Sequence, residues 1–160
     1  MPGSPRDDLV FDDFINIDLN RGMRRLQQIF YRKALQDSGL SLQEWRSLLT
    51  VARYGDTHVR ELARLASLDA THTGRAALVL EKRGLIRRYA DPNDSRRMRL
   101  VATAQGHEMV DTIWVKARAI DTQVKDKIGR TRYRALREAL KLILEMEHEK
   151  EAHREDDVAR

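Results

Sequence analysis

Residues 80–106 read LEKRGLIRRYADPNDSRRMRLVATAQG. Gly84 closes a helical pattern, and two short segments typical of strands follow it at 85–89 and 98–102. The residues between them, 90–97, combine turn formers with two adjacent arginines, which predicts a β-hairpin with an extended polar tip. Because such a tip has no core to bury, we expect it to reach toward a phosphate-lined groove.

Two short helical patterns precede the hairpin. The first covers 58–66, the second 70–83, and the polar residues 67–69 join them. This arrangement predicts a helix-turn-helix, although an ordinary pair of antiparallel helices has the same pattern. Upstream, Ser41 and Glu44 form a capping-box sequence for a helix whose expected buried face consists of Leu42, Trp45, Leu48, Leu49 and Ala52.

Long amphipathic helices are predicted on both sides of this segment. One covers 12–36 and ends at Ser38 and Gly39; its stripe contains Ile15, Leu19, Met23, Leu26 and Ile29. The other side, 104–150, begins after a capping Thr103 and is broken at Gly129; its apolar residues include Ile113, Ile120, Leu136, Leu140 and Ile143. Nothing in the chain obviously covers these stripes, so we expect a homodimer, with a self-contained bundle as the alternative.

The positive charge is concentrated in the middle of the chain. The segment from Arg60 to Leu100 contains ten basic and five acidic residues, and therefore carries the whole formal net charge of +5. The segment from Glu145 to Asp157 is acidic, with seven acids against two bases. A basic middle between acidic ends indicates a surface for a polyanion, although ordinary solvated charge is the alternative.

The composition excludes several classes of function. The 160 residues are enough for one domain, and no stretch approaches the roughly 18 apolar residues of a membrane span. We therefore expect a cytoplasmic protein. The chain has no cysteine, and His58, His72, His107, His148 and His153 form no metal-ligand motif. A glycine-rich phosphate loop is also absent, so we predict no cofactor, no metal and no enzyme.

Three linked motifs carry a family resemblance: Leu80-Glu81-Lys82-Arg83-Gly84-Leu85, Asp91-Pro92-Asn93-Asp94-Ser95-Arg96, and Ala102-Thr103-Ala104-Gln105-Gly106. Together with the order of helices they resemble the MarR family over residues 12–150. The resemblance implies a mainly α fold with a small β-hairpin wing. The winged helix-turn-helix DNA-binding lobe would cover 41–102, and dimerisation helices would cover 12–36 and 104–150. Outside this unit we expect a flexible leader, 1–11, and a disordered acidic tail, 151–160.

The resemblance also implies a DNA-binding site. It makes Ala70 to Arg83 the recognition helix and selects Thr71, His72, Thr73, Arg75, Arg96 and Arg97 as DNA-binding residues. Arg75 suits a bidentate contact with guanine, whereas Thr71 and Thr73 suit phosphates at a helix N-terminus. His72 is equally compatible with simple solvent exposure. Either wing arginine is a candidate for the minor groove, and Asp94 is either an ion-pair partner that stabilises the wing or a turn residue.

Four positions depart from the family pattern. Gly74 replaces a side chain within the recognition helix, which implies either a close approach to that backbone or a tolerated loss of stability. Leu78 and Val79 replace positions that are commonly polar, so part of this helix is expected to pack against something that the motif does not reveal. Ala102 replaces a leucine and is expected to be harmless.

The predicted function is that of a ligand-responsive transcription repressor that binds a pseudo-palindromic operator in double-stranded DNA as a homodimer. The alternative is an architectural protein that binds DNA without sequence preference. By resemblance, the effector would be an aromatic or phenolic anion bound between the dimerisation helices and the lobe. Candidate ligand residues, for each of which a place in the core or on the surface is the alternative, are Arg21, Arg25, Trp45, His107 and Trp114.

Overall fold

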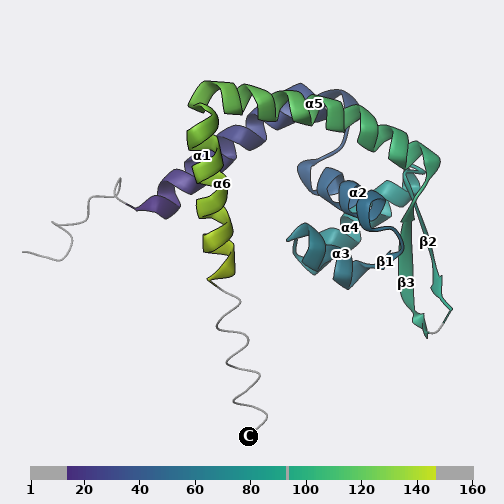
Figure 1. Cartoon of the computed structure of the whole chain (residues 1–160). Helices are drawn as coiled ribbons and strands as arrows, with labels where there is room; N and C mark the ends of the chain where they lie inside the picture. Colours follow the sequence, from purple (N-terminus) through teal and green to yellow (C-terminus); the bar gives the residue numbers. More distant parts are fainter. Residues whose placement is uncertain (1–13, 93, 147–160) are drawn as a thin grey trace, which may run out of the picture. The chain divides into compact units, whose positions relative to one another are not determined.

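The computed structural model describes residues 14–92 and 94–146 (Figure 1). The predicted leader and acidic tail lie outside the described residues, as do His148 and His153. The chain divides into two compact units, Met1–Ala117 and Arg118–Arg160. The fold is mainly helical with a small antiparallel sheet, which confirms the predicted fold class.

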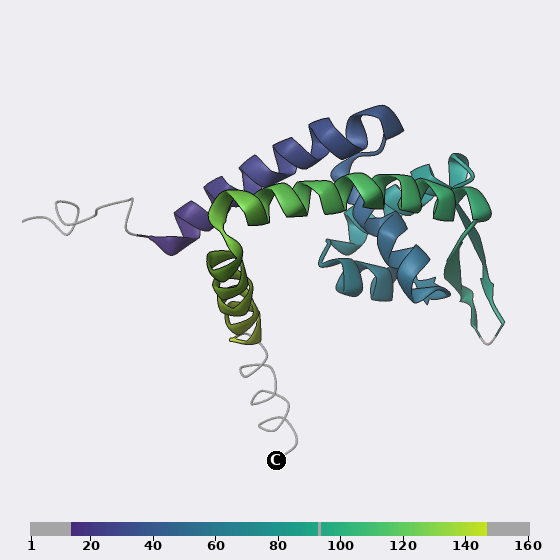
Figure 2. The same cartoon turned by 45° about the horizontal axis from the view of Figure 1, so that its top comes forward.

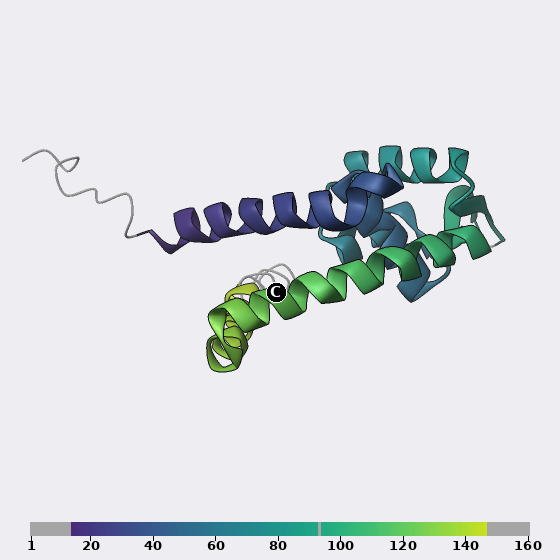
Figure 3. The ribbon, with the colours of Figure 1, turned by 90° about the horizontal axis from the view of Figure 1, so that it is seen from above.

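The first helix is one continuous element in three parts. The α-helix α1, Ile15–Phe30, runs into a π-helical turn, η2, Tyr31–Leu35, and a short 3-10 turn, η3, Gln36–Ser38. Gly39, with φ of +64°, ends it at the predicted position, because a left-handed conformation costs glycine little. No residue of α1 is buried, and Figure 3 shows the helix extending away from the lobe.

Three helices form the core of the lobe: α2, Leu42–Tyr54; α3, Val59–Ala66; and α4, Ala70–Lys82. The predicted capping box begins α2, since the Glu44 amide donates to the Ser41 hydroxyl at 3.2 Å and the Ser41 amide donates to the Glu44 carboxylate at 2.8 Å. Trp45 and Leu48 are buried as predicted. Ser47, Thr50 and Val51 are buried as well, because α3, α4 and the sheet pack around more than one side of α2.

The sheet has three antiparallel strands in the order β1-β3-β2: β1, Thr57–His58; β2, Ile86–Asp91; and β3, Asp94–Ala102. In the hairpin, Ile86 lies opposite Ala102 and Tyr89 lies opposite Arg99. The sequence prediction missed β1 and assigned His58 to the next helix. This strand has two residues, and it is stabilised by pairing with Leu100 and Arg99, far along the chain, rather than by a local pattern.

The helix α5 covers Ala104–Ile128, and its start packs closely against Gly84 and Leu85, which follow α4. The Thr103 hydroxyl accepts from the Gly106 amide at 3.1 Å and donates to the Gly84 carbonyl at 2.6 Å. A Cβ on Gly106 would lie 2.0 Å from the Leu85 carbonyl oxygen. The glycine of the third motif is therefore required by backbone contact, and Thr103 is the predicted helix cap.

The second unit contains the end of α5 and the helix α6, Arg130–Glu145, with Gly129 at φ of +85° between them (Figure 2). The Tyr133 hydroxyl donates to the Asp121 carboxylate, and Lys125 lies 5.1 Å from the centre of the Tyr133 ring. The hydrogen bond to Asp121 raises the pKa of Tyr133. These contacts fix the turn between the helices, while Leu136, Leu140 and Ile143 of α6 remain exposed.

None of the helices in residues 14–92 and 94–146 combines the length and apolar character that crossing a membrane requires.

Two helical glycines provide a matched test of this packing. Gly106→Ala should lower the free energy of unfolding by about 1–3 kcal/mol, because its Cβ would collide with the Leu85 backbone. Gly74→Ala should raise it by up to about 1 kcal/mol, because a Cβ there meets nothing within 4 Å and alanine favours the helix. Urea unfolding measures both, and equal effects of the two substitutions would contradict the close approach at Gly106.

Candidate DNA-binding interface

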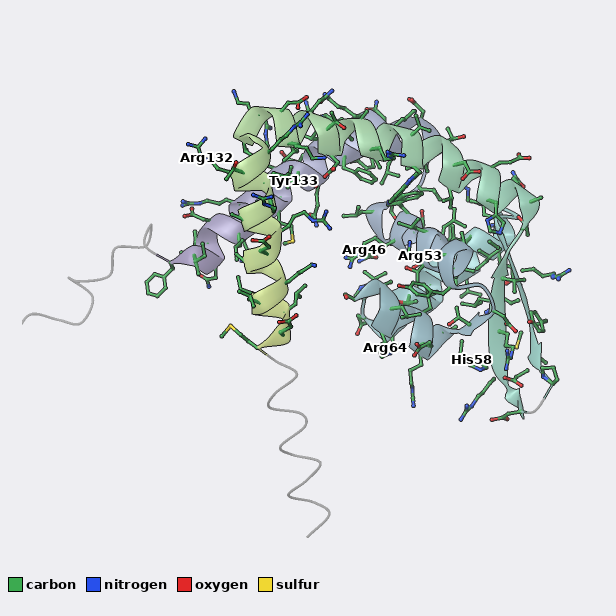
Figure 4. The ribbon with its side chains drawn as sticks, in the orientation of Figure 1. Arg46, Arg53, His58, Arg64, Arg132 and Tyr133 are labelled. Atoms are coloured by element: carbon green, nitrogen blue, oxygen red, sulfur yellow. The ribbon has the colours of Figure 1, made fainter. Side chains whose placement is uncertain are left out.

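The turn between α3 and α4 is held by a side chain from α2. Ser67 adopts a left-handed conformation with φ of +49°, which is unusual for a residue other than glycine. The guanidinium of Arg46 donates to the carbonyls of Ala66 and Ser67, where α3 ends (Figure 4). A cation at the C-terminus of a helix also interacts favourably with the helix dipole. Arg46 therefore fixes the angle at which α4 follows α3, and the predicted helix-turn-helix is present.

The helix α4 has two distinct faces. Its inner face, Thr73, Ala76, Ala77 and Leu80, is buried against α2 and α3. Its outer face is exposed and consists of Thr71, His72, Arg75, Leu78, Val79 and Lys82. Among the exposed residues of α4, all of which the structure describes, none is acidic. The outer face is therefore a positively charged ridge that suits the major groove of DNA.

One of the predicted DNA-binding residues is on the wrong face. Thr73 is 0% exposed, and its hydroxyl donates to the Asp69 carbonyl at 2.7 Å. Its side chain belongs to the core, so the prediction that Thr73 holds a phosphate is wrong. The sequence interpretation grouped Thr73 with its neighbours, but residue 73 lies on the side of the helix opposite residues 71 and 75.

The N-terminus of α4 is already capped by a carboxylate. Asp69 accepts from the amides of Thr71 at 2.8 Å and His72 at 3.1 Å, and its carboxylate lies 3.2 Å from the His72 ring. The hydrogen bonds donated by the backbone amides of His72 and Thr71 hold the pKa of Asp69 below its ordinary value. A phosphate at this helix end would meet the negative charge of Asp69. Binding by α4 must therefore rely on the side chains of its outer face.

At the wing tip, the carboxylate of Asp94 lies 3.1 Å from the Arg97 guanidinium. This ion pair agrees with the wing-stabilising role that the resemblance implies for Asp94. Both groups are substantially exposed, so the pair orients the tip more than it stabilises the fold. The backbone of Arg96 lies in β3, whereas its side chain lies outside what the structure describes.

The end of β2, next to the hairpin turn, contains a buried aspartate that sequence reasoning did not select. Asp91 is 6% exposed and accepts from Arg99 Nε at 2.8 Å. Its carboxylate also lies 3.1 Å from His58 Nε2. Because His58 is in β1, Asp91 in β2 and Arg99 in β3, this cluster joins all three strands. The first aspartate of the wing motif therefore anchors the hairpin to the lobe.

The same arginine extends the cluster toward the loop before β1. Arg99 donates from its terminal nitrogen to Asp56 at 2.6 Å. Hydrogen bonds from the Tyr89 hydroxyl and then from Arg99 lower the pKa of Asp56, and the bond to Asp56 raises the pKa of Tyr89. The pKa of Arg99 rises because Asp56 and Asp91 both accept from it. The guanidinium is thus shared between two carboxylates, which fixes the direction in which the hairpin leaves the lobe.

A groove of about 610 Å³ lies between the start of α3 and the wing, lined by His58, Val59, Arg60, Glu61, Arg97 and Met98. The exposed Arg60 adds a cation to the positive surface formed by α4 and the wing tip. Sequence reasoning counted Arg60 in the basic segment but did not assign it to the site. The missing signal was strand β1, which brings the first residues of α3 beside β3.

The predicted ligand residues are not gathered in one place. Arg25 lines a pocket of about 520 Å³ on α1, η2 and the start of α2, together with Arg24, Gln27, Gln28, Tyr31, Arg32 and Leu42. Trp45 is 4% exposed and packs against Phe30, with 6.1 Å between the ring centres, so it serves the core. Arg21, His107 and Trp114 are exposed side chains outside the lining of this pocket.

Within residues 14–92 and 94–146, no three histidine or acidic side chains are grouped as a metal site would require.

The chain resembles transcription regulators in sequence and structure. A family model described as the MarR family matches residues 40–98, which hold α2, α3, α4 and most of the wing. Over 133 residues, the chain is 26% identical to the HTH-type transcriptional regulator FarR of Neisseria gonorrhoeae, covering 83% of this chain and 90% of FarR.

Solved structures extend the similarity over most of the chain. The crystal structure of NadR in complex with 4-hydroxyphenylacetate is similar with a TM-score of 0.68 at 26% identity, covering 88% of this chain and 95% of NadR. BpsR of Bordetella bronchiseptica, whose DNA binding is regulated by 6-hydroxynicotinic acid, has a TM-score of 0.78 at 19% identity, covering 84% and 96% of the two chains. At that identity the BpsR similarity concerns the fold.

The two aspartates that flank the hairpin turn provide a matched test of how the wing is anchored. Asp91→Asn should lower the free energy of unfolding by about 1–3 kcal/mol, because it replaces the buried carboxylate between Arg99 and His58 by a neutral amide with only one acceptor oxygen. Asp94→Asn removes an exposed ion pair and should cost less than about 1 kcal/mol. Denaturant unfolding measures both. Hydrogen exchange should also accelerate in β1 and β3 for Asp91→Asn alone; a larger effect of Asp94→Asn would contradict the anchoring role.

Proposed function

We propose that the chain, which belongs to the MarR family of winged helix-turn-helix transcription regulators, binds a pseudo-palindromic operator as a homodimer and represses transcription until a small anion binds. The observation that carries DNA binding is the outer face of α4, which presents Thr71, Arg75 and Lys82 to solvent and on which none of the exposed residues of α4 is acidic. Arg75 is the side chain that suits a guanine edge, since a guanidinium can donate to O6 and N7 together.

The wing would contact DNA beside the recognition helix. Arg97 is 67% exposed at its side chain, and with Arg60 it lines the groove between α3 and β3. The minor groove offers a degenerate code, so arginines there sense groove width and phosphates more than base identity. We therefore assign base recognition to α4 and general affinity to Arg60, Arg96 and Arg97.

Exposed apolar faces on the long helices support a homodimer. On α1, Ile15, Met23 and Leu26 are exposed, and on α6 the exposed apolar residues are Leu136, Leu140, Leu142, Ile143 and Leu144. Apolar surface of this extent is unusual on a protein that remains a monomer. A two-fold dimer would present two recognition helices and two wings, which matches a DNA site with dyad symmetry.

The effector site that the geometry favours is the pocket on α1, η2 and α2. Arg24, Arg25 and Arg32 supply cations for a carboxylate, and the Tyr31 ring supplies an apolar face for an aromatic group. NadR, at 26% identity, has been solved with 4-hydroxyphenylacetate, an aromatic carboxylate of this kind. Because Leu42 begins the first helix of the lobe, an anion here would act where the dimerisation helix meets that lobe.

Substitution of the arginines tests the assignment of roles. On an operator selected from random DNA, Arg75→Ala should weaken specific binding by about 1–3 kcal/mol for each contacted guanine and relax preference at one position of each half-site. The double variant Arg96→Ala, Arg97→Ala should weaken binding to selected and scrambled DNA alike and reduce its salt dependence. Salt titrations of each variant on both DNAs measure these effects.

The selected DNA sequences, the number of chains bound to each and the titrations together separate the proposal from its rival. Two chains per selected site and a dyad-symmetric motif are expected for a dimeric regulator. Selection that returned no motif would indicate an architectural protein that binds DNA without sequence preference. A wing variant that lost specificity, together with an Arg75→Ala variant that lost only general affinity, would show that the roles of α4 and the wing are the reverse of those proposed.

A further inference from the structure

Two large apolar side chains lie among the polar and basic residues of the outer face of α4. Leu78 is 51% exposed and Val79 is 40% exposed. Leu78 is three residues after Arg75, and Val79 is four residues after it, so both adjoin Arg75 on the helix surface. The inner face of α4 is already filled by Thr73, Ala76, Ala77 and Leu80, so neither side chain serves the core of this lobe.

The major groove offers a single apolar group at its base edges, the 5-methyl of thymine. The other base edges there present hydrogen-bond donors and acceptors, which leucine and valine cannot satisfy. We propose that Leu78 and Val79 read thymine methyl groups in each half-site, next to the base contacted by Arg75. This inference rests on the proposed function, since it requires that the outer face of α4 lies in the major groove.

The helix geometry is compatible with neighbouring base pairs. Three residues advance a helix by about 4.5 Å, whereas successive base pairs are about 3.4 Å apart. A side chain three or four residues after Arg75 would thus meet the next base pair or the one beyond it. The half-site should accordingly contain thymine within one or two positions of the guanine that Arg75 contacts.

Gly74 allows the helix to approach the bases. It lies on the same side as Thr71 and Leu78, and a Cβ there would meet no protein atom within 4 Å. The space outside this backbone is therefore open for DNA, and the side chains beside it gain reach into the groove. Such an approach accounts for a glycine in a helix interior, where alanine would stabilise the fold.

The charge of the surrounding surface favours DNA over a protein partner. Arg75 and Lys82 flank Leu78 and Val79 on the same face, and Glu81, the acid nearest in sequence, is paired with Arg88 at 2.6 Å. A polyanion would match these cations while its thymine methyls cover the apolar side chains.

Replacement of thymine by deoxyuridine tests this directly, because it removes the methyl group and leaves base pairing unchanged. On the selected operator, each contacted thymine replaced by deoxyuridine should weaken binding by the full chain about fourfold. Thymines outside the half-sites should have no effect when replaced. The double variant Leu78→Ala, Val79→Ala should bind the thymine operator more weakly and should not respond to deoxyuridine.

A control variant, Val115→Ala, removes an exposed apolar side chain from α5 and should keep the full response to deoxyuridine. Three results would overturn the inference while leaving specific DNA binding intact. The full chain could bind both operators equally, the double variant could keep its response, or the double variant could bind the thymine operator as the full chain does. The last result would show that the apolar pair does not contribute to operator binding. Failure to bind any selected DNA would instead contradict the proposed function.

Discussion

The burial of one face of α4 determines which of its side chains the other face presents to solvent. Thr73, Ala76, Ala77 and Leu80 pack against α2 and α3, and this contact leaves a single rotation of the helix available. Arg46 then sets the angle of α4 by holding the carbonyls at the end of α3. The identity of the outward residues is therefore a consequence of core packing, and a substitution in the inner face would reorient the DNA-facing side chains together.

The wing depends on a different kind of contact. Its strands carry many charged residues, and it is joined to the lobe by the buried carboxylate of Asp91 with Arg99 and His58. A buried carboxylate held between two cationic or hydrogen-bonding partners resists displacement. If it moved away from them, its buried negative charge would have no partner. Exposed pairs such as that of Asp94 and Arg97 adjust more freely. Asp91 thus holds the hairpin firmly to β1, while the exposed pair beside its turn is adaptable, which suits contact with a groove of variable width.

Much of this arrangement could be predicted from the sequence, because the relevant signals were local. The capping box at Ser41, the helix ends at Gly39 and Gly84, and the entry at Thr103 each depend on residues a few positions apart. The features that could not be predicted depended on contacts between distant residues or on the rotation of a helix about its own axis. Strand β1 exists through pairing with β3, Asp91 gains its role from His58 and Arg99, and the inward direction of Thr73 follows from the packing of α4. Trp45 was predicted to be a ligand residue, but its side chain is buried in the core.

Disulfide cross-linking to DNA tests most directly whether the outer face of α4 lies in the major groove. The chain has no cysteine, so a thiol introduced by Arg75→Cys is unique. With an operator that carries a thiol tether on a major-groove base, Arg75→Cys should cross-link at one position of each half-site. Glu108→Cys, on an exposed position of α5, should not cross-link at any position. Efficient cross-linking from residue 108, or none from residue 75 at any tether position on DNA that the variant binds, would contradict the assignment of α4 as the recognition helix.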